Sequence, residues 1–232
     1  MSMEKQQKDS NQRFERKYTF SNNNIDLVLN SLRDFENGIS QCFPTRQIHS
    51  FYFDTPELTF ARENIEGFSN RKKLRFRCYG DLSEAKKFNI ELKVKNSLMG
   101  SKIINSLQLD KNNLTSQPLH KWLPEDLLPQ ELWMYYYELI PTVRISYTRQ
   151  YLMDSKNDLR ITLDTDIVST PLIGSSELAF DYISGAFDYC VLEVKYGKDA
   201  LIDYSKFIKR LPFRLTRHSK YLSALETFNL VY

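Results

Sequence analysis

Basic side chains recur at every second position in several separate stretches of this chain. The clearest stretch is residues 73–79, with the sequence KLRFRCY. In a β-strand, successive side chains point to opposite faces. Lys73, Arg75 and Arg77 are therefore expected to share one face of a strand, with the apolar residues between them on the other. The same alternation returns in residues 90–95, 159–164 and 191–196.

The direction in which these charged faces point decides what the chain can do. An antiparallel sheet commonly has one face in water, and charged residues on that face need no function. If the strands closed into a barrel, the charged faces could point inward instead. A cationic interior repels itself unless it is filled by a polyanion, or by anions with a metal ion. Phosphate chains and divalent cations fit that description.

Composition limits the remaining possibilities. A chain of 232 residues with 41% hydrophobic residues suits one large domain or two small ones. The formal net charge is only +3, which argues against a generic nucleic-acid binder. Cys42, Cys78 and Cys190 show neither a zinc spacing nor a disulfide framework, so they indicate a reducing compartment. We expect Cys78 and Cys190 to lie in the core, because both occur in apolar strand contexts.

No leader and no membrane-spanning run are found in the sequence. Residues 1–12 are polar, and no stretch approaches the roughly 20 apolar residues needed to cross a bilayer. We therefore expect a cytoplasmic protein with a flexible tail over residues 1–12 and a single domain over residues 13–232.

Periodicity predicts eight or more strands with helices inserted between them. A short amphipathic helix is expected over residues 25–32, after a capping segment at 22–24. Prolines interrupt the two longest helical patterns, at 112–138 and 200–228. Neither a P-loop nor a G-x-G-x-x-G motif is present. The expected strands are residues 13–20, 46–54, 71–80, 87–96, 102–109, 141–154, 159–167, 177–183 and 188–196.

The charged faces carry residue types that bind phosphate and metal. A planar guanidinium can bind two phosphate oxygens, and strand geometry places Arg75 and Arg77 about 7 Å apart. The motifs Glu91-x-Lys93 and Glu193-x-Lys195 each place a carboxylate beside an ammonium. Such a carboxylate could hold a divalent cation, or could form a cross-strand ion pair of little energetic value.

Two arginines on the strand predicted at 141–154 cannot be placed by alternation. Arg149 shares a parity with Tyr147 and Tyr151, whereas Arg144 has the opposite parity. At least one of the two arginines should therefore face outward or follow a bulge, and the sequence leaves open which one faces the interior.

Several of these segments together resemble the VTC-type polyphosphate polymerase domain. Residues 13–18 (RFERKY) are similar to its R-x-E-x-K-Y strand, residues 50–55 (SFYFDT) to its S-x-Y-F-D-T strand, and residues 73–79 to its K-x-R-x-R-x-Y strand. Further similar segments follow in the family's order at residues 91–93, 144–149, 160–164, 192–196 and 219–221. The resemblance spans about residues 13–225.

This family belongs to the triphosphate tunnel metalloenzymes, within the CYTH-like superfamily. The resemblance implies an α+β fold: a closed antiparallel β-barrel of about eight strands, with inserted helices and a C-terminal helix. Relatives that act as triphosphatases or cyclases open with E-x-E-x-K, whereas Arg13 occupies the first of those positions here. That difference favours the polymerase branch. The eukaryotic members carry a phosphate-sensing domain and membrane helices, and the chain has neither, which implies a stand-alone prokaryotic form.

The resemblance also implies roles for individual residues. Phosphate-binding and catalytic roles would fall to Lys17, Arg75, Arg77, Lys93, Arg144 or Arg149, Arg160, Lys195 and Lys220. Glu193 would bind Mn²⁺ or Mg²⁺, with Glu91 and Glu15 as possible helpers.

The implied reaction moves the γ-phosphoryl group of ATP, or of another nucleoside triphosphate, onto an inorganic polyphosphate chain. A metal-dependent tripolyphosphatase or nucleoside triphosphatase is the main alternative, and a non-catalytic polyanion-binding module is a further one. No nucleic-acid partner is expected. A monomer or homodimer is expected, and a membrane-protein partner is possible.

Overall fold

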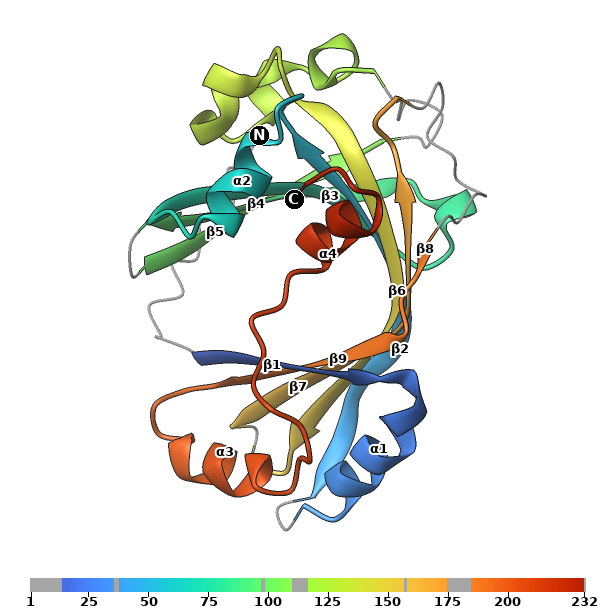
Figure 1. The fold of residues 1–232 in the computed structure, drawn as a ribbon, viewed down its shortest axis with the longest axis vertical. Helices are drawn as coiled ribbons and strands as arrows, with labels where there is room; N and C mark the ends of the chain where they lie inside the picture. The colour runs from blue at the N-terminus through green and yellow to red at the C-terminus, as the bar shows by residue number, and fades with distance from the viewer. Residues whose placement is uncertain are drawn as a thin grey trace. The chain divides into compact units, whose positions relative to one another are not determined.

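The computed structural model describes residues 14–35, 38–96, 99–109, 117–156, 158–174 and 185–231. Its strands and helices are drawn in Figure 1. The strands are β1 (Phe14–Ser21), β2 (Ile39–Asp54), β3 (Asn70–Tyr79), β4 (Lys87–Asn96), β5 (Met99–Gln108), β6 (Ile140–Asp154), β7 (Leu159–Pro171), β8 (Gly185–Ala186) and β9 (Tyr189–Tyr196). The α-helices are α1 (Ile25–Arg33), α2 (Thr59–Ile65), α3 (Leu201–Ile208) and α4 (Lys220–Thr227).

The nine strands form one sheet in the order β1-β9-β7-β6-β2-β3-β4-β5, with β8 paired to β7. The pairs β1–β9, β2–β3, β3–β4, β4–β5 and β7–β8 are antiparallel. This confirms an antiparallel sheet with a few helices. Hydrogen bonds between the described residues do not join β1 to β5 at the ends of this order, so the closed barrel that the resemblance implied is not confirmed.

The chain divides into two compact units. Unit 1 contains residues 1–44, 150–163 and 189–217, and unit 2 contains residues 45–149, 164–188 and 218–232. Strands β2, β6 and β7 contribute residues to both units. The single domain over residues 13–232 stays a prediction.

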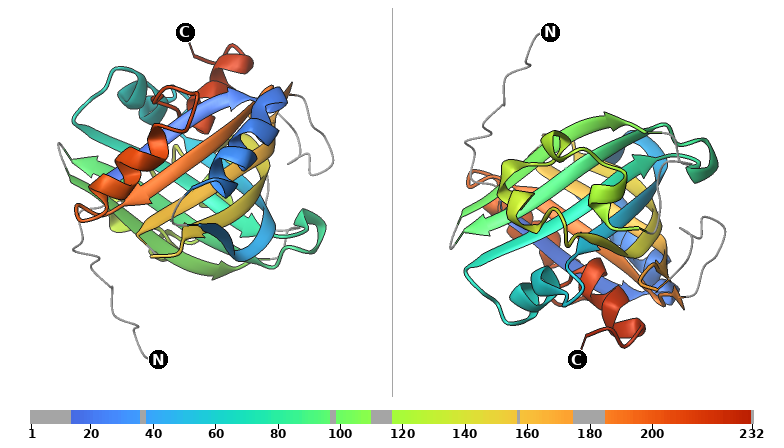
Figure 2. Two further views of the ribbon diagram at one scale, coloured as in Figure 1. Left: turned by 90° about the horizontal axis from the view of Figure 1, so that it is seen from below. Right: turned by 90° about the horizontal axis from the view of Figure 1, so that it is seen from above.

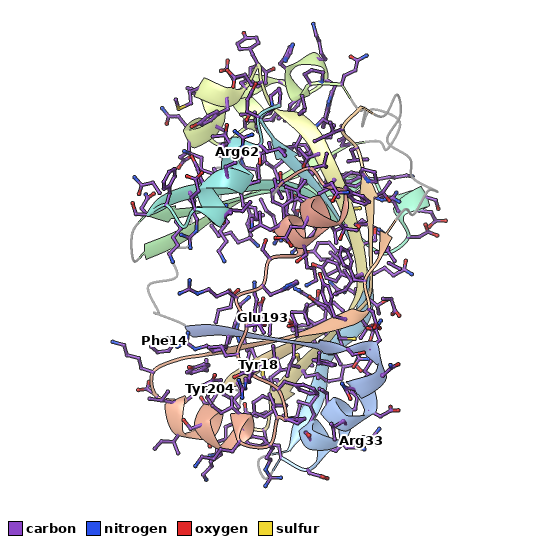
Figure 3. The ribbon with its side chains drawn as sticks, viewed as in Figure 1. Phe14, Tyr18, Arg33, Arg62, Glu193 and Tyr204 are labelled. Atoms are coloured by element: carbon purple, nitrogen blue, oxygen red, sulfur yellow. The ribbon has the colours of Figure 1, made fainter. Side chains whose placement is uncertain are left out.

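In unit 1, α1 and α3 cover one face of the strands (Figure 1). The second half of β1, all of β9 and the first part of β7 bury alternate residues in the core that contains the two helices. Tyr18 and Tyr204 join β1 to α3 through a 2.7 Å hydrogen bond between their hydroxyls (Figure 3). The Tyr204 ring stacks on Tyr196 at 4.0 Å between centroids. Because the apolar residues of unit 1 point to this face, Glu15 and Lys17 of β1 and Glu193 and Lys195 of β9, which have the opposite parity, point to the other.

In unit 2, alternate residues of β2, β3 and β4 form the core. Leu74, Phe76 and Cys78 of β3 are at most 1% exposed, which confirms the face predicted from the alternation. The segment that packs against these strands contains three short 3-10 helices, η4 (Leu119–Lys121), η5 (Glu125–Leu127) and η6 (Gln130–Tyr135). Figure 2 shows this segment across β3, β4 and β5. The apolar face of the strands is therefore covered, and their charged face is the opposite one.

The helical pattern predicted for residues 112–138, with proline breaks, forms only short 3-10 helices within its described part. Pro118, Pro124 and Pro129 each stand immediately before one of the three short 3-10 helices. Each proline removes a backbone N–H and favours an extended preceding residue, so no long α-helix can run through them.

Other predicted elements are confirmed or adjusted. The helix at 25–32 is confirmed as α1, and the expected strand at 46–54 already begins at Ile39. The helical pattern at 200–228 forms α3 and α4, with a non-helical stretch around Pro212. The tail at 1–12 and the strand at 177–183 lie outside the described residues. Within the described residues, no helix has the length and apolar character needed to cross a bilayer.

The three cysteines should differ in reactivity. Cys78 and Cys190 are buried as predicted, and Cys42 is exposed. Burial is the main cause that raises the pKa of the Cys78 thiol, to about 12, so almost no thiolate forms at neutral pH. We expect a thiol reagent such as Ellman's reagent to modify one cysteine of the folded chain and three after denaturation. The folded Cys42→Ser variant should not react, and rapid modification of that variant would contradict the assignment.

Candidate functional site

A group of ion pairs lies on the charged face of β3 and β4. Arg75 stands directly opposite Glu91 in the antiparallel register. Its Nε and Nη2 atoms lie 2.7 and 2.5 Å from Glu91 Oε2. Arg77 Nη1 is 3.5 Å from the same oxygen, and Lys102 of β5 is 3.2 Å from Oε1. One carboxylate, only 3% exposed, therefore holds three cationic side chains from two strands, β3 and β5.

These cations keep Glu91 ionised. Burial of the carboxyl group acts to raise its pKa, but Arg75, Arg77 and Lys102 outweigh that effect and lower the pKa to about 2. A buried carboxylate with such partners stabilises the folded state only while it is charged. Glu91 therefore acts as a permanent anchor for the arginines at neutral pH.

Unfolding measured at acidic pH should reveal the contribution of ionised Glu91 to the stability of the folded state. The contribution of Glu91 is fully present above its ordinary pKa of 4.5 and is lost as the pH falls towards about 2. We expect Glu91→Gln to lower the free energy of unfolding by a few kcal/mol at pH 7. The difference from wild type should shrink as the pH falls from 5 to 2 in urea titrations. The exposed control Glu57→Gln should change the unfolding free energy by less than about 0.5 kcal/mol. A pH-independent Glu91→Gln difference would contradict the assignment.

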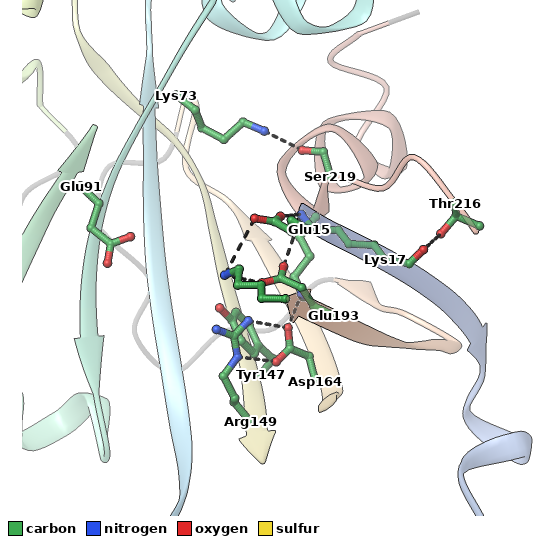
Figure 4. Close-up of polar contacts among 12 residues, drawn as sticks. Glu15, Lys17, Lys73, Glu91, Tyr147, Arg149, Asp164, Glu193, Thr216 and Ser219 are labelled. Atoms are coloured by element: carbon green, nitrogen blue, oxygen red, sulfur yellow. Dashed lines mark hydrogen bonds and ion pairs between the residues drawn. The ribbon is translucent and has the colours of Figure 1, made fainter. Parts of the chain in front are cut away.

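A second buried carboxylate holds cations from β6 and α4. Asp164 of β7 is 1% exposed. Arg149 donates to both of its oxygens, from Nε at 2.6 Å and from Nη2 at 2.8 Å (Figure 4). Lys220 Nζ lies 2.5 Å from Asp164 Oδ2. Burial acts to raise the pKa of Asp164, but Lys220 and Arg149 outweigh it and lower the pKa.

Tyr147 connects the two ion groups. Arg77 Nη2 donates to the Tyr147 hydroxyl at 3.1 Å. The Tyr147 ring lies 5.3 Å from the Arg149 guanidinium and 4.7 Å from Lys220 Nζ, within cation–π range. Side chains from β3, β6, β7 and α4 therefore form one network.

The start of α4 is attached to the same face. Ser219 is the N-cap of α4 and accepts a hydrogen bond from Leu222 N. Lys73 Nζ also donates to the Ser219 hydroxyl, at 2.8 Å (Figure 4). One residue after Lys220, Tyr221 donates to Asp54 Oδ2 at 2.9 Å. These contacts hold the residues before and after Lys220 against β2 and β3, and so hold the first turn of α4 that carries Lys220.

Asp54 explains one of the sequence motifs structurally. It is buried and accepts hydrogen bonds from the backbone N–H of Thr55 and from those of Phe60 and Ala61 at the start of α2. The aspartate of the segment SFYFDT therefore orders a helix start and holds Tyr221, and the structure gives it no direct place in the network of cations.

The lowered pKa of the Tyr52 phenol reflects the positive charge at this face. Arg75 Nη1 donates to the Tyr52 hydroxyl at 3.3 Å, and Tyr52 stacks on Tyr221 at 4.7 Å. Burial acts to raise the pKa of the phenol, but Arg75, Arg77 and Lys220 outweigh it and lower the pKa below 10.0.

We call Lys73, Arg75, Arg77, Lys102, Arg149 and Lys220, together with Glu91 and Asp164, the basic cluster.

Unit 1 carries a separate group of charges on β1 and β9. In the antiparallel register, Lys17 stands opposite Glu193 and Glu15 stands opposite Lys195. Lys17 Nζ is 3.1 Å from Glu15 and 3.6 Å from Glu193, and Lys195 Nζ is 2.6 Å from Glu193 and 3.8 Å from Glu15. Figures 3 and 4 show Glu193 on this strand pair. We call Glu15 and Glu193 the carboxylate pair.

The carboxylate pair has donor atoms of the kind that a divalent metal prefers, and its metal role stays a prediction. Mg²⁺ is commonly bound through one or two carboxylates together with phosphate oxygens and water. Glu15 and Glu193 share two lysine partners, and their side chains are 31% and 12% exposed. No group of three or more His, Cys, Asp and Glu suited to a metal occurs in the described part of the chain. Glu91 is instead surrounded by three cations, so its predicted role as a metal helper stays untested.

The remaining predicted site residues lie in different settings. Lys93 is exposed on β4, with the parity of Glu91, and Arg160 is exposed on β7, with the parity opposite to the buried residues of unit 1. Arg144 is 3% exposed and donates to Thr170 Oγ1 at 3.0 Å. Arg149 binds Asp164 of the basic cluster, and the choice between Arg144 and Arg149 as the residue that faces the interior stays a prediction.

Sequence reasoning missed three members of the basic cluster as site residues. Lys73 opened the alternating stretch, and Asp164 closed the stretch at 159–164, but neither was given a role. Lys102 stands opposite Lys93 in the β4–β5 register, so knowledge of the strand pairing would have found it.

Comparison with models of protein families shows to which family the chain belongs. A model of the VTC domain matches residues 12–229. The chain belongs to the VTC domain family. The family predicted from the eight sequence segments is thereby confirmed. A comparison with curated proteins gave no match.

One solved structure shows the same fold with little sequence identity. HpAC1 from Hippeastrum, provisionally assigned as an adenylyl cyclase and reported to have a dominant triphosphatase activity, is 15% identical with a TM-score of 0.57. The match covers 93% of this VTC domain and 96% of that chain. A protein from Vibrio parahaemolyticus, also provisionally assigned as an adenylate cyclase, is 17% identical over 92% of this chain and 97% of its own, with a TM-score of 0.49.

Proposed function

We propose that this VTC domain is a polyphosphate polymerase that transfers the γ-phosphoryl group of ATP to inorganic polyphosphate. The observation that carries the proposal is the charge balance of the basic cluster. Five cationic side chains contact two carboxylates that are at most 3% exposed, and Lys73 on the same face donates to Ser219. Cations gathered in excess are costly unless an anion accompanies them. A phosphate chain supplies many negative charges in a row.

Substrate binding is assigned to the basic cluster. Arg75, Arg77 and Arg149 offer planar donors that match phosphate oxygens, and Lys220 offers a point charge. Phosphoryl transfer depends mainly on positioning and on stabilising charge that spreads over the transferred group. Arginines held by Glu91 and Asp164 would meet that requirement without large rearrangement.

The chemistry of the acceptor favours transfer over hydrolysis. A terminal polyphosphate oxygen is already ionised near neutral pH, so it can attack the γ-phosphorus without losing a proton. The bond from the γ-phosphorus to the β–γ bridging oxygen breaks, and ADP leaves. Water would need a general base, which works best with a pKa near the operating pH. Both carboxylates of the basic cluster instead have lowered pKa values.

A divalent metal would be held by Glu15 and Glu193. When bound, Mn²⁺ or Mg²⁺ neutralises charge on phosphate oxygens. Lys17 and Lys195 contact both carboxylates and are assigned to phosphate binding beside them. Lys93, Arg144 and Arg160 stay predictions as phosphate ligands, as do the cytoplasmic location, the monomer or homodimer and the membrane-protein partner.

Product analysis tests the proposal. The protein is incubated with ATP and Mn²⁺, and the products are separated on a gel stained for polyphosphate. A ladder of products together with ADP is expected. Free phosphate without a ladder would favour the triphosphatase alternative, for which the reported activity of HpAC1 is the supporting observation. Tight, salt-dependent binding of polyphosphate without turnover would favour the non-catalytic module.

A further inference from the structure

We propose that Asp164 is a positioning residue for phosphoryl transfer, and that it acts by holding Arg149 and Lys220 in their working arrangement. The proposal rests on the function proposed above and assigns a role within the same site. Asp164 itself is not expected to touch the substrate, because an anionic group repels phosphate.

The contacts of Asp164 combine three separate parts of the chain. The carboxylate belongs to β7, Arg149 to β6, and Lys220 to the first turn of α4. Both oxygens bind the Arg149 guanidinium, at 2.6 and 2.8 Å, and Oδ2 also binds Lys220 Nζ at 2.5 Å. A two-point contact determines the plane of a guanidinium, which a single hydrogen bond does not.

If Asp164 is a positioning residue, its cationic partners must be able to bind its carboxylate and a phosphate group at the same time. A guanidinium carries five N–H groups and an ammonium carries three, so each can bind both partners at once. The Tyr147 ring lies against Arg149 and Lys220, and its hydroxyl accepts from Arg77. A displacement of Arg149 or Lys220 would therefore move Tyr147, and through Tyr147 it would also change the position of Arg77.

A role in stability alone makes a different prediction. Asp154 is a matched control, because it is an aspartate that is 2% exposed and accepts hydrogen bonds from the backbone N–H groups of Asp158 and Leu159. If Asp164 only supported the fold, Asp164→Asn and Asp154→Asn should both lower the melting temperature and leave kcat per folded molecule unchanged.

The experiment measures turnover of ATP with Mn²⁺ and, separately, binding of tripolyphosphate by calorimetry. For Asp164→Asn we expect kcat to fall about 10- to 100-fold, because a misplacement of about 1 Å can cost that much. The dissociation constant of tripolyphosphate should stay within threefold of wild type or become tighter, because a negative charge has been removed. Asp154→Asn should change neither quantity by more than twofold.

Two further variants keep the test decisive if Asp164→Asn folds poorly. Asp164→Glu keeps the charge but moves the carboxylate by about one methylene length, so we expect kcat to fall at least fivefold while binding stays near wild type. In an Arg149→Met/Lys220→Met background, Asp164→Asn should cause almost no additional loss, since it acts through those two residues.

Each outcome bears on one claim. An active wild type with kcat unchanged in both Asp164 variants overturns the role of Asp164 and leaves the proposed function standing. Full additivity in the triple variant also overturns it. A wild type that produces neither polyphosphate nor free phosphate overturns the proposed function, and the role of Asp164 falls with it.

Discussion

Replacing Arg75 with alanine is expected to lower kcat/KM for polyphosphate formation by about 1000-fold or more. Arg75 lies between Glu91 and the Tyr52 hydroxyl on the charged face of β3. Its guanidinium is assigned to phosphate oxygens on which charge develops in the transition state, where one lost donor typically costs about 100- to 1000-fold. A bidentate arginine contributes more than one donor. Initial rates with ATP and Mn²⁺ would measure the effect.

The fold should survive this substitution. Glu91 keeps Arg77 and Lys102 as partners in the Arg75→Ala variant, so the buried carboxylate is not left without a counter-charge. Arg75→Lys is the matched control, because it keeps the charge and loses the planar donor set. We expect it to retain more activity than alanine and less than wild type. Lys220→Ala should be nearly as inactive as Arg75→Ala. Wild-type rates in both alanine variants would contradict the assignment of the basic cluster.

Replacing Glu193 with glutamine is expected to remove metal-dependent turnover, with a loss of at least about 100-fold. The glutamine keeps the shape of the side chain and loses the charge that a hard cation such as Mg²⁺ or Mn²⁺ requires. Tripolyphosphate binding without metal should persist or strengthen, because Lys17 and Lys195 lose an anionic partner. Rates measured across a Mn²⁺ titration should show a weaker apparent affinity for the metal.

An acidic residue elsewhere provides the control for the loss of Glu193. Glu226 of α4 is exposed, and Glu226→Gln should leave both the rate and the Mn²⁺ dependence unchanged. A Glu193→Gln protein with the wild-type Mn²⁺ dependence would remove the carboxylate pair from the reaction. The metal would then have to be sought at other carboxylates.

Local patterns were reliable wherever one face of an element is buried. Leu74, Phe76 and Cys78 were predicted to share a face, and they do so in the core of unit 2. A strand has a side-chain period of two, so the apolar residues alone determine which face turns inward. The helix at 25–32 was predicted for the same reason, because its apolar residues recur at helical spacing.

Local patterns were less informative about the type and length of helices and about contacts between distant strands. The proline breaks expected in the stretch at 112–138 are present, but its described part forms 3-10 helices and no α-helix. Closure of the barrel could not be judged either, because closure depends on hydrogen bonds between strands that are distant in sequence. Alternation likewise gave no choice between Arg144 and Arg149.

The amino-acid sequence by itself determined the family, the strands and the identity of most cationic residues assigned to the site. These depend on residue types and on short spacings, which are written directly in the chain. Only the tertiary structure decided that Glu91 and Asp164 each hold several of these cations, and that Arg149 is one of them. The physical reason is that the partners lie 11 to 56 residues apart in sequence. Electrostatic attraction acts on separation in space, and folding alone determines that separation.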